Sequence, residues 1–186
     1  MTTADGERSG TGRRVLVAYG SRRGSTREIA EEVGTALEED GFQVSVFPAA
    51  QVHDVTRYDA VVLGGALYMY RWHREARRFA RCHALALSGR PVWLFSSGSL
   101  DHTADEREIP PVPSAARAAR RLDARGHTTF GGRLGPDSPG RLARGMVARG
   151  TAGDYRNLEQ IRTWAHGIAS LLDKEPPTEG KERTPR

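Results

Sequence analysis

Short apolar runs recur along the chain and are separated by longer segments of mixed polarity. Continuous apolar runs are typical of strands that are buried on both faces of a sheet, and strict alternation is typical of strands with one exposed face. The run at 42–47 alternates, and those at 15–19, 60–63 and 91–95 are continuous. The pattern predicts strands over Val15–Tyr19, Phe42–Phe47, Ala60–Leu63, Pro91–Phe95 and Thr128–Leu134.

Between the strands, apolar residues recur every three to four positions, which is the period of an amphipathic helix. Gly41 and Gly89 end two of these segments, as glycine often does after a helix. Strands that are separated by helices favour a parallel sheet covered on both faces, so we expect an α/β fold. The predicted helices are Thr26–Asp40, His73–Leu87, Pro113–Ala124 and Asp154–Leu172.

A loop rich in glycine and hydroxyl groups joins the first predicted strand to the first helix. Glycine lets the backbone turn sharply, hydroxyls donate hydrogen bonds, and a helix N-terminus presents unpaired N–H groups to an anion. The loop is therefore a candidate phosphate site, and two arginines add positive charge. Its residues are Ser21, Arg22, Arg23, Gly24, Ser25 and Thr26.

The spacing within this loop argues against two common nucleotide sites. A P-loop ends in Gly-Lys-Ser/Thr, whereas Gly24 is followed directly by Ser25. The dinucleotide fingerprint G-x-G-x-x-G is absent, and the second strand closes with Phe47-Pro48 in place of an acidic residue. A single monophosphate remains as the ligand. The alternative is an ordinary turn in which Ser25 or Thr26 caps the helix.

Two further loops leave the same ends of the predicted strands, where ligands bind in open parallel sheets. One begins with Gly64-Gly65, which we expect to let the backbone approach a ring, and continues through Ala66, Leu67, Tyr68, Met69 and Tyr70. The other contains Ser97, Gly98, Ser99 and Leu100. Together the three loops suit a flat aromatic ligand with a phosphate tail.

Composition narrows the remaining choices. The chain has 186 residues, enough for one domain with a sizeable core, and its single cysteine, Cys82, excludes an internal disulfide and a thiolate metal cluster. The net charge of +5 reflects arginines crowded over 71–81 and 117–149. Stacking aromatics are not interleaved with them, so we expect a solvated basic surface and no nucleic acid partner. We predict no metal site.

The loop with its flanks, residues 19–30, resembles the FMN-phosphate loop of the flavodoxin superfamily, and more narrowly the flavodoxin-fold protoporphyrinogen oxidases. The likeness continues through Tyr58–Gly65, the strand before Ser96, the strand end Phe130–Leu134 and the helix around Trp164. It implies a doubly wound sheet of five parallel strands in the order 2-1-3-4-5. It also implies FMN, with its phosphate on Ser21–Thr26 and its ring between Ala66–Tyr70 and Ser97–Leu100.

The chain departs from the family pattern at two places. Arg23 stands where the usual loop has a hydroxyl, and the oxidases' apolar insertion is matched by the arginine-containing stretch Gly135–Gly153. If an organic substrate lies against the flavin, the expected contacts are Tyr70, Arg71, Trp72 and Arg74, through aromatic stacking and charge-assisted hydrogen bonds.

Three functions stay open: an FMN-dependent oxidoreductase with its own small-molecule substrate, an electron carrier to a redox partner protein, and a binding module that has lost FMN. We expect a cytoplasmic protein with at most peripheral, salt-sensitive membrane contact, and a homo-oligomer stays open. The predicted domain spans residues 13–172, between disordered tails at 1–12 and 173–186.

Overall fold

The computed structural model describes residues 12–21, 24–99, 103–134, 148 and 153–175. Five parallel strands form the central sheet in the spatial order β2-β1-β3-β5-β6. This order confirms the predicted fold class, since these are the five predicted strands in the arrangement 2-1-3-4-5. The strands are β1 (Arg14–Gly20), β2 (Gln43–Pro48), β3 (Ala60–Tyr68), β5 (Val92–Ser99) and β6 (Gly126–Gly131).

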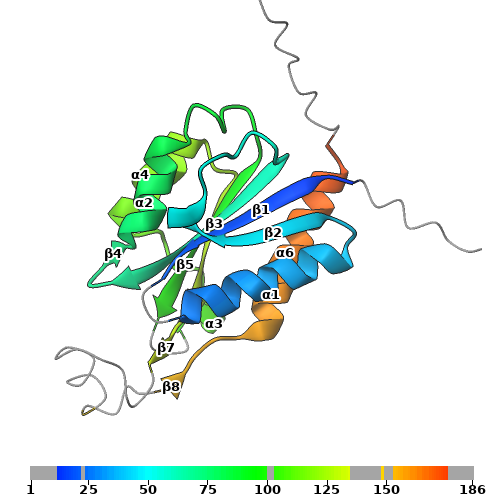
Figure 1. The fold of residues 1–186 in the computed structure, drawn as a ribbon. Coiled ribbons are helices and arrows are strands. Elements are labelled where there is room, and N and C mark those ends of the chain that lie inside the picture. Colours follow the sequence, from blue (N-terminus) through cyan, green and yellow to red (C-terminus); the bar gives the residue numbers. More distant parts are fainter. Residues whose placement is uncertain (1–11, 22–23, 100–102, 135–147, 149–152, 176–186) are drawn as a thin grey trace, which may run out of the picture.

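Helices cover both faces of the sheet (Figure 1). On one face, α1 (Ser25–Glu39) and α6 (Leu158–Asp173) pack over a core that includes Phe95 and Phe130. On the other face, α2 (Arg74–Cys82) and α4 (Pro113–Leu122) cover a second core that includes Trp72. Two short helices, η1 (Ala49–Gln51) and α3 (Thr103–Glu106), complete the described helices.

Several element boundaries differ from the sequence prediction. The predicted helix 73–87 ends as α2 at Cys82, and residues 84–89 form turns that bury Leu87 while Leu85 stays exposed. The predicted helix 154–172 begins at Leu158, because the Asn157 side chain caps it by accepting from the Gln160 amide at 3.1 Å.

The last predicted strand is divided into two. β6 ends at Gly131, and β7 (Arg133–Leu134) instead pairs with β8 (Gly153–Asp154) in a separate antiparallel ribbon. The break lies at Gly132, where an added Cβ would come within 2.7 Å of the Gly98 Cα. Gly132 therefore lets the backbone pass close to Gly98 at the point where the chain leaves the main sheet.

The two ends of the described domain are tied together. The buried Arg13 guanidinium donates to the backbone carbonyls of Leu172, in the last turn of α6, and of Glu175, just beyond this helix. Residues 173–175 are thus part of the packed structure, although most of the two predicted tails lies outside the described residues.

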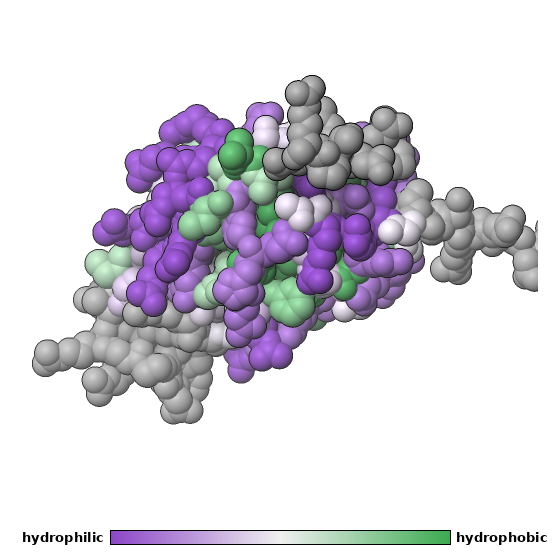
Figure 2. Space-filling model, turned by 45° about the horizontal axis from the view of Figure 1, so that its top comes forward, coloured by the Kyte–Doolittle hydropathy of each residue, from purple (hydrophilic) through white to green (hydrophobic). Residues whose placement is uncertain are grey.

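Polar side chains cover much of the visible described surface, with apolar side chains between them (Figure 2). Among the described residues, no helix combines the length and apolar character needed to cross a membrane.

Candidate functional site

The three predicted loops lie at one edge of the sheet, because β1, β3 and β5 are parallel and in register. Gly20 is paired with Gly65, and Ala66 with Ser97. The carboxyl ends of the three strands therefore meet at the same edge, which is where open α/β sheets bind ligands.

The loop between β1 and α1 is shaped to leave a helix N-terminus open. Gly24, at the N-cap, has a φ of 85°, a conformation that favours glycine, and its amide donates to the Oγ of Ser21 at 3.1 Å. The Ser25 Oγ is buried and has no hydrogen-bond partner among the described residues. Ser25 therefore does not cap the helix, and a buried hydroxyl without a partner lies beside an uncapped end of α1.

A second loop is a tight hairpin that the sequence did not predict. β3 turns at Met69 and Tyr70 into β4 (Arg71–Trp72), which pairs antiparallel with β3. Both turn residues have positive φ, 48° and 57°, as a two-residue type I′ turn requires. This conformation is unfavourable for residues other than glycine, asparagine and aspartate. The turn holds Tyr70 89% exposed.

Trp72 does not join the exposed side chains, in contrast to its predicted role as a substrate contact. It is 1% exposed, and a Cβ on Gly65 would come within 2.4 Å of its indole ring. Gly64 makes room in the same way for the ring of Phe95, with a Cβ distance of 2.1 Å. These two glycines therefore make room for aromatic side chains of the protein's own core. The sequence analysis had instead expected them to let the backbone approach a ligand ring.

The third loop begins at a β-bulge in β5. The register shifts between Ser97 and Ser99, and Gly98 has a φ of 145°. A Cβ on Gly98 would lie 3.0 Å from the Cβ of Leu67, so this loop packs directly on the end of β3. The described part thus places two of the predicted ring loops against each other.

The predicted site residues are only partly described. Tyr68, Met69, Tyr70, Arg71 and Arg74 are exposed, and Thr26 and Ser97 are buried. The structure describes the backbone of Ser99, while Arg22, Arg23 and Leu100 lie outside the described residues.

Next to the third loop, a histidine is partly buried in the sheet. Ser96 Oγ and His127 Nε2 lie 2.8 Å apart, and the Nδ1 atom of His127 is buried without a partner among the described residues. Burial lowers the pKa of His127 to about 4. The imidazole is therefore neutral near pH 7.

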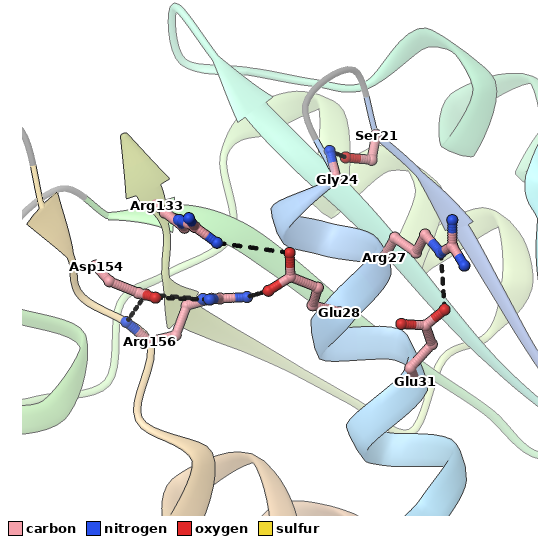
Figure 3. A network of polar contacts seen from close by, with 8 residues as sticks. All are labelled: Ser21, Gly24, Arg27, Glu28, Glu31, Arg133, Asp154 and Arg156. Atoms are coloured by element: carbon pink, nitrogen blue, oxygen red, sulfur yellow. Dashed lines mark hydrogen bonds and ion pairs between the residues drawn. The ribbon is translucent and has the colours of Figure 1, made fainter. Parts of the chain in front are cut away.

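A polar cluster beside the first turn of α1 was also missed by the sequence analysis. Arg156, which follows β8, donates to the carboxylates of Glu28 and Asp154, and Arg133 of β7 approaches Glu28 at 3.7 Å (Figure 3). The segment that follows β8 is therefore bound to the helix whose N-terminus faces the loop. The sequence contains many charged residues, and nothing in their spacing indicates that Arg156 pairs with Glu28.

Comparisons with known proteins agree with this architecture. A family profile described as "Flavodoxin domain" matches residues 16–156. The quinone-type protoporphyrinogen IX dehydrogenase of Escherichia coli K12 is 32% identical over 109 residues, which are 56% of this chain and 58% of that protein. The chain thus matches little more than half the length of this curated relative.

Solved flavodoxin structures share the fold at low sequence identity. A flavodoxin from Archaea has a TM-score of 0.58 and 16% identity, covering 86% of this chain and 99% of its own. The rubredoxin oxygen:oxidoreductase of Desulfovibrio gigas has a TM-score of 0.59 and 15% identity, covering 86% and 36% respectively. Because the family profile spans most of the chain, this protein belongs to the flavodoxin domain family.

Proposed function

We propose that the protein binds FMN, with the phosphate at the N-terminus of α1. The observation that carries this proposal is the buried Ser25 hydroxyl, which has no partner within the described part of the chain and lies beside the uncapped end of the helix. Buried polar atoms are nearly always hydrogen-bonded, so an unpartnered donor at an anion-binding helix end fits a missing phosphate oxygen. Membership of the flavodoxin domain family, which generally binds FMN, supports the same ligand.

The flavin ring would lie between the β3–β4 hairpin and the loop after β5. Both leave the sheet edge that carries the phosphate loop, and the contact between Gly98 and Leu67 sets their spacing. When bound, FMN supplies the electron-transfer chemistry, while these residues bind and orient it.

We further propose an oxidoreductase that acts on a conjugated organic substrate, such as a porphyrinogen or a quinone. Tyr68 and Tyr70 present aromatic faces at the hairpin, and Arg71 and Arg74 lie exposed beside them. Aromatic side chains stack on conjugated rings, and guanidinium groups bind carboxylates. The match to a protoporphyrinogen dehydrogenase supports this substrate class.

An electron carrier is the second candidate function. The positive charge of the helical layer formed by α2 and α4 favours a carrier that docks to an acidic partner protein. Six arginines are exposed on α2 and α4, and none has an ion pair with another described residue; they are Arg74, Arg78, Arg81, Arg117, Arg120 and Arg121. On the opposite layer, Arg27 and Arg162 pair with carboxylates of α1. The protein therefore offers a basic face to a redox partner.

The test is a flavin spectrum of the purified protein followed by anaerobic stopped-flow reoxidation. We expect the reduced flavin to be reoxidised by a soluble quinone or to react with a porphyrinogen. The Tyr70→Ala variant should react more slowly while retaining FMN. Leu85→Ala, which removes an equally exposed side chain from the turn after α2, is the matched control and should react like the wild type.

Two results would change the assignment. Rapid electron exchange with partner proteins, together with no reaction with quinones or porphyrinogens, would establish an electron carrier. Failure of the apoprotein to bind FMN would establish the binding module.

A further inference from the structure

Glu28 brings a negative charge close to the proposed phosphate site. It lies in the first turn of α1, and its amide donates to the carbonyl of Gly24 at 3.0 Å. One helical turn thus separates it from the loop. A carboxylate at this distance repels a phosphate dianion, and the repulsion would lower the affinity of the site.

Two guanidinium groups from outside α1 offset this charge. Arg156 donates to Oε2 of Glu28, and Nη1 of Arg133 lies 3.7 Å from Oε1 (Figure 3). Both arginines come from the β7–β8 ribbon and the residues that follow it. The residues that flank the ribbon are joined near this point, since the Tyr155 amide donates to the carbonyl of Gly132, which directly follows β6, at 3.0 Å.

Arg156 is held more firmly than Arg133. Its Nε and Nη2 atoms donate to the two carboxylate oxygens of Asp154 at 2.8 and 2.6 Å, and its side chain is 10% exposed. The hydrogen bonds that Arg156 donates to Asp154, followed by the one to Glu28, raise the pKa of Arg156, so the guanidinium stays charged. The hydrogen bonds from Arg156 in turn lower the pKa of Asp154. With Glu28 and Arg133, the cluster has two positive and two negative groups.

We propose that Arg156 is a positioning residue that sets the phosphate affinity of the α1 N-terminus by neutralising Glu28. Without Arg156, the cluster carries a net negative charge one turn from the phosphate. Without Glu28, it carries a net positive charge there. The inference rests on the proposed FMN site and assigns a role to the segment after β8 in phosphate recognition.

Titration of the apoprotein with FMN and with riboflavin, followed by flavin fluorescence, tests the proposal. Arg156→Gln should weaken FMN binding by about three- to tenfold, the size expected for one charge within a Debye length. Glu28→Gln should strengthen it by a similar factor. The double variant should return near the wild-type affinity, because the cluster is again neutral.

Riboflavin lacks the phosphate, so its affinity should be the same in all four proteins. The differences for FMN should also shrink as salt is added. Arg156→Lys keeps the charge and should retain most of the FMN affinity. Arg162→Gln is the matched control, since Arg162 pairs with Glu32 and Glu39 farther along the same helix.

The outcomes separate this inference from the proposed function. The inference is wrong, and the FMN site stands, if the Arg156→Gln variant binds FMN as tightly as the wild type or loses affinity for riboflavin as much as for FMN. It is also wrong if adding Glu28→Gln does not restore the FMN affinity of the Arg156→Gln variant. If the wild type binds FMN no better than riboflavin, the phosphate site itself is wrong.

Discussion

The amide of Trp72 donates a hydrogen bond of 2.9 Å to the Oγ of Ser114. This bond joins β4 to the first turn of α4, although 42 positions separate the two residues. Both groups are buried, so the bond is shielded from water. It anchors the hairpin that presents Tyr70 at the candidate site.

Ser114→Ala should loosen the hairpin. The variant leaves the Trp72 amide buried without an acceptor, which costs about 1–3 kcal/mol. Urea denaturation should show this loss of stability, and hydrogen exchange should show faster exchange at the Trp72 amide. Ser88→Ala, at an exposed serine, is the control and should change neither quantity. Unchanged exchange in Ser114→Ala would mean that the bond does not hold the hairpin.

Ser25→Ala should separate cofactor binding from stability. In the apoprotein it removes a buried hydroxyl that has no partner among the described residues, so stability should stay equal or rise slightly. FMN binding should weaken by about 1–3 kcal/mol, or about 5- to 150-fold, through loss of a donor to the phosphate. Calorimetry measures both effects. Wild-type FMN affinity would place the phosphate elsewhere.

Gly65→Ala should be strongly destabilising. Its Cβ would lie 2.4 Å from the Trp72 ring, and overpacking of this kind costs about 1–3 kcal/mol. Gly167→Ala is the matched control, because it lies in α6 with no atom near the new Cβ. The control should be more stable by about 0.5–1 kcal/mol, as expected for alanine in a helix. Thermal unfolding of the two variants should therefore shift in opposite directions.

His127 should make stability depend on pH. Its pKa is lowered to about 4 in the folded state by burial, against 6.5 for the ordinary group. The unfolded state therefore binds more protons between these values, and stability present above pH 6.5 is lost as pH falls toward 4, by on the order of 3 kcal/mol. His127→Gln should flatten this part of the stability profile. An equally steep profile in the variant would assign the effect to other groups.

The sequence by itself determined the class of fold and the place of the candidate site. Periods of apolar residues are local properties, so they identified the five strands and the main helices, and the alternation of elements implied a parallel sheet. The glycine- and hydroxyl-rich loop after Tyr19 also identified a candidate phosphate loop, because its chemistry lies within a few consecutive residues.

The tertiary structure decided what distant residues do to one another. Gly65 gave a local signal for close approach, but only packing showed that the approaching ring is Trp72. Likewise, 128 positions separate Glu28 from Arg156, and their contact depends on how the β7–β8 ribbon lies against α1. Side-chain periodicity carries no information on such pairs, since packing between elements brings them together only in the folded chain.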